Sequence, residues 1–185
     1  KDEARPEALT QDWIAYFFDR ARLVSDTEMQ SIWAKLLAEE ANSPARFSRA
    51  TIDIVSRLDR DDAALFTKLA SYSWFDDEGG ILFIDRAKYC SGIFKFRELS
   101  QLEDMGLVKV DVLAGFFIIF SESPANLSYF GKTIVLNNLE SISNRIPSGH
   151  VILTKAGRQL LHLADGRPDD EYMKRVLQSW IDDEQ

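Results

Sequence analysis

The stretch Val24–Asn42, VSDTEMQSIWAKLLAEEAN, joins a helix start signal to an apolar stripe. Ser25 and Glu28 have the S-x-x-E spacing of a capping box, in which the two side chains accept two otherwise free backbone N–H groups. Five large apolar residues then recur at helical spacing: Met29, Ile32, Trp33, Leu36 and Leu37. Because spacings of three and four residues fall on one face of a helix, we predict that this segment is the core-forming helix of an N-terminal helical bundle.

Three more helices are predicted in the first part of the chain, and each follows a residue that favours the N-cap position. Thr10 is expected to cap a helix over residues 11–23. Ser48 is expected to cap a third helix, and Asp59 a fourth that ends near Ser71. Together with the Val24–Asn42 helix, these segments predict a four-helix N-terminal part.

The composition changes at residues 74–80, WFDDEGG, where an acidic run and two glycines interrupt any helix. We therefore predict two parts, a helical bundle over residues 1–75 and a winged-helix-like α+β region over residues 76–185. The elements expected in the second part are a strand at 81–84, a helix at 94–105 ended by Gly106, a two-strand hairpin of 107–113 with 116–120, a strand within 129–136, a strand at 150–153, and two C-terminal helices, the first capped by Thr154. The predicted fold class is α+β, with a winged-helix-like or small antiparallel-sheet region after the bundle.

The charge balance bears on the kind of partner. The chain carries 22 Lys and Arg against 30 Asp and Glu, a net charge of −8, and this balance argues against nucleic acid as the principal partner. The single cysteine, Cys90, excludes an internal disulfide, and no apolar run is long enough for a membrane span or a secretion signal. We expect a cytoplasmic protein that does not contact membranes. Because the sequence begins with Lys1, we also expect it to be part of a longer protein.

Residues that could carry chemistry are few. His150 and His162 lack Cys or carboxylate neighbours at metal-ligand spacing, and Cys90 is better explained as a structural thiol than as a nucleophile. Four acidic clusters are present, at Asp59/Asp61/Asp62, Asp76/Asp77/Glu78, Asp169/Asp170/Glu171 and Asp182/Asp183/Glu184. We interpret them as helix starts, a turn and a tail. The sequence thus predicts no catalytic residue, no metal ligand and no cofactor, although a metal-dependent hydrolase or nuclease built from these clusters remains an alternative.

Two short patterns in the second part resemble the end of winged-helix domains. These are L-x-x-x-G-L-[IV] followed later by L-T-x-x-G-x-x-L, carried by Leu102, Gly106, Leu107 and Val108 and then by Leu153, Thr154, Gly157 and Leu160. A DNA reader needs basic and amide groups on the helix before the first pattern. That helix offers Lys95, Arg97 and Gln101 against Glu98, Glu103 and Asp104. A DNA-binding winged-helix regulator is therefore the alternative function.

The segment Trp13–Trp74 resembles a bacterial family, the domain of unknown function 2806. The matching residues are Trp13, Phe17 and Phe18; Val24 to Asp26 with Glu28 to Gln30; Trp33, Ala34, Leu37, Ala38 and Glu40; Pro44, Phe47 and Ser48; and Asp62, Ala63, Leu65 and Phe66. Two departures are Glu39 and Ala45, which stand where the family pattern has glycine. The segment is more distantly similar to the alpha-type abortive-infection proteins of phage defence. The resemblance implies no catalytic residues, and phage defence is a role implied by that likeness alone.

The stretch Phe116–Phe120, FFIIF, is apolar at every position, so the rest of the chain or another subunit must cover both of its faces. The last helix similarly ends in the aromatic Trp180. We therefore predict a protein-interaction or regulatory module that forms a homo-oligomer or binds a protein partner. The residues expected at the interaction surface are Phe116, Phe117, Ile118, Phe120, Tyr172, Val176 and Trp180.

Overall fold

The computed structural model describes residues 9–76, 79–84, 92–120, 123–137 and 145–183. Its helices are α1 (Gln11–Ala21), α2 (Thr27–Asn42), α3 (Arg49–Val55), α4 (Arg60–Ala70), α5 (Phe96–Asp104), α6 (Lys155–Leu161) and α7 (Asp170–Asp183). Its strands are β1 (Ser73–Asp76), β2 (Gly79–Leu82), β3 (Val108–Val110), β4 (Phe116–Ile119), β5 (Ala125–Tyr129), β6 (Lys132–Leu136), β7 (Arg145–Gly149) and β8 (Val151–Leu153). The paired strands are antiparallel, and the predicted α+β class is confirmed.

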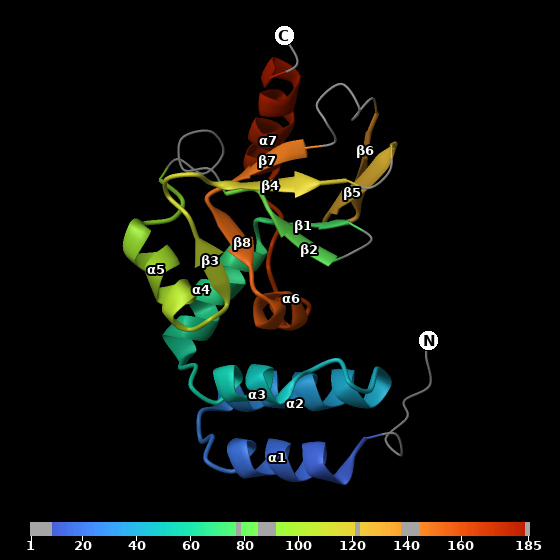
Figure 1. Cartoon of the computed structure of the whole chain (residues 1–185). Helices are drawn as coiled ribbons and strands as arrows, with labels where there is room; N and C mark the ends of the chain where they lie inside the picture. The colour runs from blue at the N-terminus through green and yellow to red at the C-terminus, as the bar shows by residue number, and fades with distance from the viewer. Residues whose placement is uncertain (1–8, 77–78, 85–91, 121–122, 138–144, 184–185) are drawn as a thin grey trace.

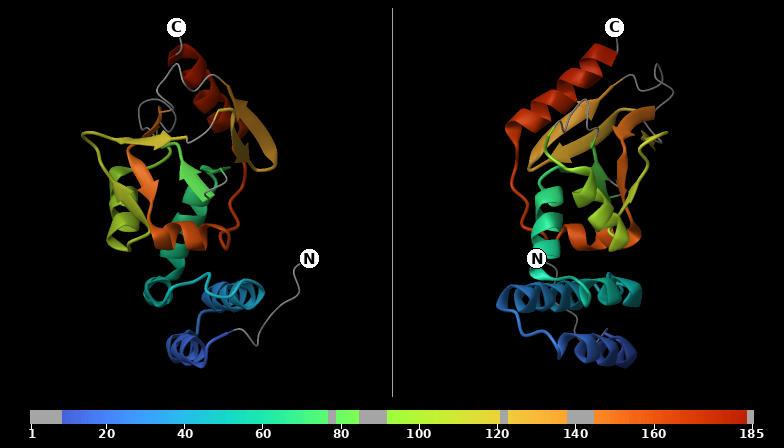
Figure 2. Two further views of the ribbon diagram at one scale, coloured as in Figure 1. Left: turned by 45° about the vertical axis from the view of Figure 1, so that its right-hand side comes forward. Right: turned by 90° about the vertical axis from the view of Figure 1, so that its left-hand side faces the viewer.

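Helices α1, α2 and α3 lie side by side at one end of the molecule, and α4 leads from them to the strands (Figures 1 and 2). An aromatic cluster joins α1 to α2. The Phe17 and Trp33 rings are 5.1 Å apart, and Trp13 Nε1 donates a hydrogen bond of 3.0 Å to the carbonyl oxygen of Phe47. Only 4% of Trp33 is exposed, so the predicted core position of this residue is confirmed.

The start of α2 differs from the prediction. The N-cap is Asp26 rather than Ser25, because one oxygen of the Asp26 carboxylate accepts the backbone N–H groups of both Glu28 and Met29 at 2.9 Å. Asp and Ser are about equally good N-caps, but a carboxylate at this position also interacts favourably with the helix dipole. The helix therefore begins one residue later than the S-x-x-E pattern indicated.

The other predicted caps are confirmed. Thr10, Ser48, Asp59 and Thr154 each accept the backbone N–H of the third residue after them. At α4 this contact is reciprocal, since the carboxylate of Asp62 accepts the backbone N–H of Asp59. These caps could be read from the sequence because each involves residues only three positions apart.

The strand pairing corrects the predicted hairpin of residues 107–113 with 116–120. Strand β3 pairs with β8 and strand β4 pairs with β7. The carboxylate of Asp111 explains the change, since it accepts the backbone N–H groups of Leu113 at 3.0 Å and Ala114 at 2.9 Å. This local turn ends β3 before it can fold back on β4. Because only His150 separates β7 from β8, the β4–β7 and β3–β8 ladders follow each other along the chain.

The remaining strands form a four-stranded sheet in the order β2-β1-β5-β6. The single strand expected within residues 129–136 is one half of the β5–β6 hairpin, whose turn at Phe130 and Gly131 has φ angles of 45° and 81°. Two consecutive positive φ angles are typical of the tight turns whose twist matches paired strands.

The buried apolar side chains of the helices and strands form one core cluster, which extends from Trp13 to Val176. Helix α7 joins this core through Tyr172, which is fully buried. The Tyr172 hydroxyl accepts a hydrogen bond of 3.1 Å from Trp74 Nε1 and lies 3.0 Å from the carbonyl oxygen of Tyr72. Within the described ranges, none of the helices has the length and apolar character needed to cross a bilayer.

Candidate functional site

The helix α5 ends in the glycine stop that the sequence predicted. Gly106 has a φ of 80°, its N–H bonds to the carbonyl oxygen of Glu103 at 2.8 Å, and the N–H of Leu107 bonds to the carbonyl oxygen of Leu102 at 3.0 Å. These two hydrogen bonds define a Schellman motif, in which a left-handed glycine closes the helix. The chain leaves α5 at this glycine and enters β3.

The two winged-helix-like patterns lie against each other. The Thr154 hydroxyl donates a hydrogen bond of 2.6 Å to the carbonyl oxygen of Gly106. The backbone N–H of Thr154 donates one of 3.0 Å to the carbonyl oxygen of Leu107. Gly157 is in even closer contact, because a Cβ atom at this position would lie 2.1 Å from the carbonyl oxygen of Leu107. The glycine of L-T-x-x-G is thus required where the first turn of α6 packs on the backbone between α5 and β3.

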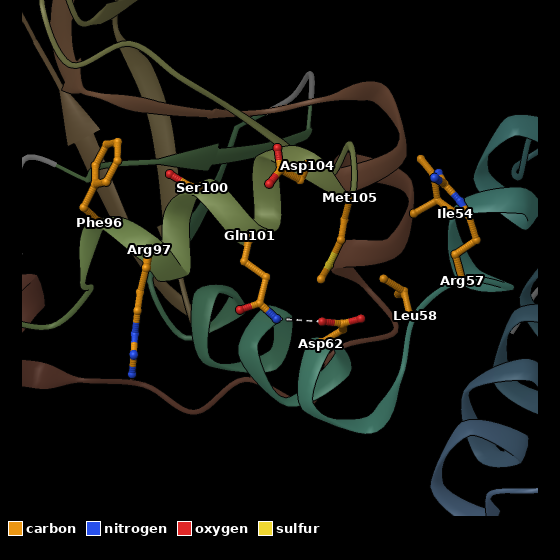
Figure 3. A pocket seen from close by; sticks show the side chains of 10 residues that line it. All are labelled: Ile54, Arg57, Leu58, Asp62, Phe96, Arg97, Ser100, Gln101, Asp104 and Met105. Carbon is orange, nitrogen blue, oxygen red and sulfur yellow. Dashed lines mark hydrogen bonds between the residues drawn. The ribbon is translucent and has the colours of Figure 1, made fainter.

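A groove of about 570 Å³ lies beside α5, between this helix and the segment that joins α3 to α4 (Figure 3). Ile54 lines it from α3, Arg57 lines it from the segment between α3 and α4, and Phe96, Arg97 and Gln101 line it from α5. Phe96 is 53% exposed, so the groove is open to solvent at this residue.

Three polar side chains of α5, those of Glu98, Gln101 and Glu103, are bound within the chain. The Gln101 side-chain amide donates to the Asp62 carboxylate at 2.7 Å, as Figure 3 shows, and Glu103 accepts the backbone N–H of Val110 at 2.8 Å. The hydrogen bond from the Lys95 backbone N–H holds the pKa of Glu98 below its ordinary value, and Lys68 at 2.9 Å adds to this effect. The Gln101 amide and the carboxylates of Glu98 and Glu103 therefore serve intramolecular contacts.

A second candidate surface is the exposed side of the β4–β7 ladder. Phe117 lies opposite Pro147 and Ile119 lies opposite Arg145, and all four side chains are exposed. The Arg145 guanidinium lies 4.1 Å from the centroid of the Phe117 ring, a cation–π contact. We call the surface of Phe117, Ile119, Arg145 and Pro147 the outer ladder face.

The family model described as protein of unknown function (DUF2806) matches residues 1–177. The chain belongs to this family. The DUF2806 match covers the helical segment whose motifs carried the resemblance and continues through α5, α6 and the strands. No curated protein and no solved structure matches the sequence.

In this DUF2806 chain, the residues predicted for an interaction surface do not form a single patch. Tyr172 and Val176 are fully buried, and Phe120 is 7% exposed. Trp180 packs on Phe83, with ring centroids 4.9 Å apart. Phe116 and Ile118 are half-buried.

Of the seven predicted residues, only Phe117 lies on the outer ladder face. Ile119 was missed, although period-two alternation from Phe117 in the apolar run could have indicated it. Arg145 and Pro147 were missed because no strand was predicted over residues 145–149, and no local signal identifies them.

The groups considered for metal or nucleophilic chemistry are dispersed where the structure describes them. No three His, Cys, Asp or Glu side chains gather as a possible metal site among the described residues. Asp169 accepts the backbone N–H of Tyr172 at 2.9 Å, and Asp170 pairs with Lys132 at 2.6 Å. Cys90 and the 77–78 portion of the second acidic cluster lie outside the described residues.

Proposed function

We propose that this chain is a cytoplasmic protein-interaction or regulatory module whose contact surface is the outer ladder face. The observation that carries this proposal is the exposure of two large apolar side chains on this face, Phe117 at 48% and Ile119 at 69%; in the segment before β4, Val112 and Leu113 are exposed as well. Soluble monomers seldom expose extended apolar patches, and such patches commonly mark protein contacts. The chain covers only one side of β4, which leaves the other side for a protein partner.

We propose further that α5, β3, β8 and α6 form a winged-helix-like unit and that the N-terminal helices form a bundle beside it. The contact of Thr154 with Gly106 and that of Gly157 with Leu107 support the first part, since they bring the two halves of the sequence pattern together. The packing of Trp33 on Phe17 supports the second. Shape alone does not assign a function, because similar folds serve unrelated functions.

A DNA-binding regulator is the less favoured alternative, because the one amide that could read bases is engaged elsewhere and acidic side chains share its helix. Gln101 is held by Asp62, and Glu103 and Asp104 are exposed on the same helix. The acidic side chains of α5 repel phosphate, so this helix lacks the basic surface that binding to a polyanion requires.

Site-specific photo-crosslinking tests the interaction surface. A photoreactive phenylalanine analogue at position 117 should give covalent adducts of discrete mass in cells that produce the full chain. The matched control is the same analogue at Val135, a residue of β6 that is 51% exposed but does not lie on the outer ladder face. Equal adduct patterns at the two positions, or none at position 117, would contradict the proposal.

The likeness to abortive-infection proteins makes phage defence the setting in which we propose that this module acts. The plating efficiency of phages on cells that produce the chain or its Phe117→Lys variant tests this role. Protection that depends on Phe117 is expected, and equal plating on the two strains and on cells without the chain would contradict it.

A further inference from the structure

We infer that the partner at this surface is a second copy of this chain, bound at the edge of β4, beside the outer ladder face, by antiparallel pairing of β4 with β4 about a two-fold axis. The inference rests on the proposed interaction surface and adds the identity and geometry of the partner. The resulting sheet would run β7-β4-β4-β7 across the two copies, with the outer ladder faces side by side.

The first argument is the open edge of β4. In the part of the chain that the structure describes, β4 pairs with β7 alone, so no described strand pairs with its opposite edge. Edge strands of monomers are usually very short or carry a charge, a proline, a bulge or a strong twist that blocks further pairing. Residues 116–119, FFII, carry neither charge nor proline. Their one irregularity, a bulge between Phe116 and Phe117, lies at the start of the strand and leaves residues 117–119 in regular register.

The second argument is that this strand is complementary to itself. In antiparallel pairing, residues that are two apart along the strand meet across the two-fold axis on the same face. Phe117 of each copy would then lie beside Ile119 of the other copy. The contact would bring the exposed side chains of Phe117 and Ile119 against each other along one side, without placing any like charges together.

The third argument is the charge at the two ends of the β4 ladder. Asp111 lies in the turn before β4, and Arg145 lies opposite Ile119 at the other end. An antiparallel dimer brings the Asp111 end of each copy toward the Arg145 end of the other. A parallel arrangement would instead place like charges at the same end. Hydrogen bonds from the backbone N–H groups of Ala114 and Leu113 lower the pKa of Asp111, so this charge persists at neutral pH.

Sedimentation of the purified full chain over a range of concentrations tests the inference. The parent chain should form a dimer, and Ile119→Lys should weaken dimerisation by roughly tenfold or more, because an ammonium group at the contact must lose its hydration. Val135→Lys is the matched control, since it adds the same charge at a similarly exposed strand residue, 51% against 69%, and should leave the dimer intact. Circular dichroism of each variant should show that the fold is unchanged.

A second pair of variants tests the orientation of the two copies. Arg145→Glu should weaken the dimer at low salt more than at high salt, because it removes the attraction to Asp111 of the other copy. Lys155→Glu changes the net charge by the same amount at an exposed residue of α6 and should have little effect.

The outcomes separate this inference from the proposed function. A chain that stays monomeric, yet forms adducts with other proteins at position 117, overturns the dimer and leaves the interaction module standing. A dimer that is unaffected by Ile119→Lys also overturns the β4 pairing. A monomer without specific adducts at position 117 contradicts both.

Discussion

Glu40 shows how a single buried charge shapes the turn after α2. Its carboxylate is 2% exposed and accepts the backbone N–H groups of Ala45 at 2.7 Å and Phe47 at 2.8 Å. Two hydrogen bonds to the ionised form make burial of this carboxylate tolerable, since a buried charge without partners is costly. Ala45 adopts a φ of 67° within the same turn, a left-handed conformation that glycine adopts far more readily than alanine.

Ala45→Gly should therefore stabilise the chain. A left-handed conformation costs an L-residue about 1–2 kcal/mol, and the greater freedom of glycine in the unfolded chain offsets about 0.5–1 kcal/mol of the gain. The expected net gain is about 0.5–1 kcal/mol in the free energy of unfolding, measured with urea. Ala15→Gly, at an exposed position inside α1, should instead lose about 1 kcal/mol. A loss at both positions would show that the φ of Ala45 carries no strain.

Trp33→Ala should lower the free energy of unfolding by about 3–5 kcal/mol, because it leaves a large cavity between α1 and α2. The residue is 4% exposed and its ring packs edge-on against Phe17. Leu23→Ala is the control, since Leu23 is 79% exposed and its truncation should change stability by less than about 0.5 kcal/mol. If the Trp33 variant is as stable as the parent, α2 is not the core-forming helix of the fold.

Helices and their ends could be predicted from local sequence patterns, but strand pairing depends on contacts between residues far apart in the sequence. Caps and the glycine stop at Gly106 could be predicted from the sequence, because their partners lie within a few residues. The pairing of β3 with β8 could not, since Val108 pairs with Leu153 far along the chain and the intervening residues give no sign of register. The candidate surface was found only in part for the same reason. Phe117 belongs to a recognisable apolar run, whereas Arg145 becomes its neighbour only through the β4–β7 pairing.

Gly157→Ala tests whether the two winged-helix-like patterns form one structural junction. Inside a helix this change normally adds about 1 kcal/mol of stability, because alanine has the higher helix propensity. Here the added Cβ would lie 2.1 Å from the carbonyl oxygen of Leu107, which cannot move without disturbing β3. We expect a loss of about 2 kcal/mol or more in urea unfolding. Lys155→Ala in the same helix should be nearly neutral, and a gain at Gly157 would rule out close packing at this point.

Tyr129 connects β5 to two other parts of the chain. From its environment we predict that the stability of the fold depends on pH in the alkaline range. Its hydroxyl donates to the carbonyl oxygen of Ser71 at 2.7 Å and accepts the N–H of Asp169 at 2.9 Å. Burial raises the pKa of Tyr129 from 10.0 to about 12. Because the folded state holds this proton more tightly than the unfolded state, the contribution to stability is complete below pH 10 and is lost as the pH rises toward 12.

The measurement is urea unfolding of the parent and of Tyr129→Phe across this range of pH. Phenylalanine has no proton to lose, so the variant should lose less stability between pH 10 and 12 than the parent does. The variant should also be less stable at neutral pH by about 1–2 kcal/mol, because two partly buried backbone groups lose their hydrogen bonds to the hydroxyl. Identical pH dependence in the two proteins would mean that Tyr129 ionises as an exposed tyrosine does.

Over the whole molecule, the surface of the N-terminal helices and the outer ladder face lie in different halves. Helices α1 to α3 lie at one end, while β4 and β7 belong to the strand half beyond α4 (Figures 1 and 2). Several basic residues of the helical end pair with acidic neighbours, as Arg20 does with Asp53 at 3.1 Å and Arg60 with Glu28 at 2.6 Å. The basic charges of this end are therefore partly neutralised within the chain, and we propose apolar contact at the strand half as the basis of association.

The last prediction follows from this distribution of charge. Binding to duplex DNA should be no tighter than about 10⁻⁴ M at physiological salt, the weak end of the non-specific range, because 22 basic residues are interspersed with 30 acidic ones. Arg97 is the exposed basic residue of α5, but acidic side chains and the engaged Gln101 share its helix. A binding assay with duplex DNA at increasing salt measures DNA binding, and sedimentation of the same preparation measures self-association, so the two functions can be compared directly. Micromolar binding by a monomer, with a steep loss as salt is added and a further loss on Arg97→Ala, would make α5 a DNA-binding helix and reverse the ranking of the two functions.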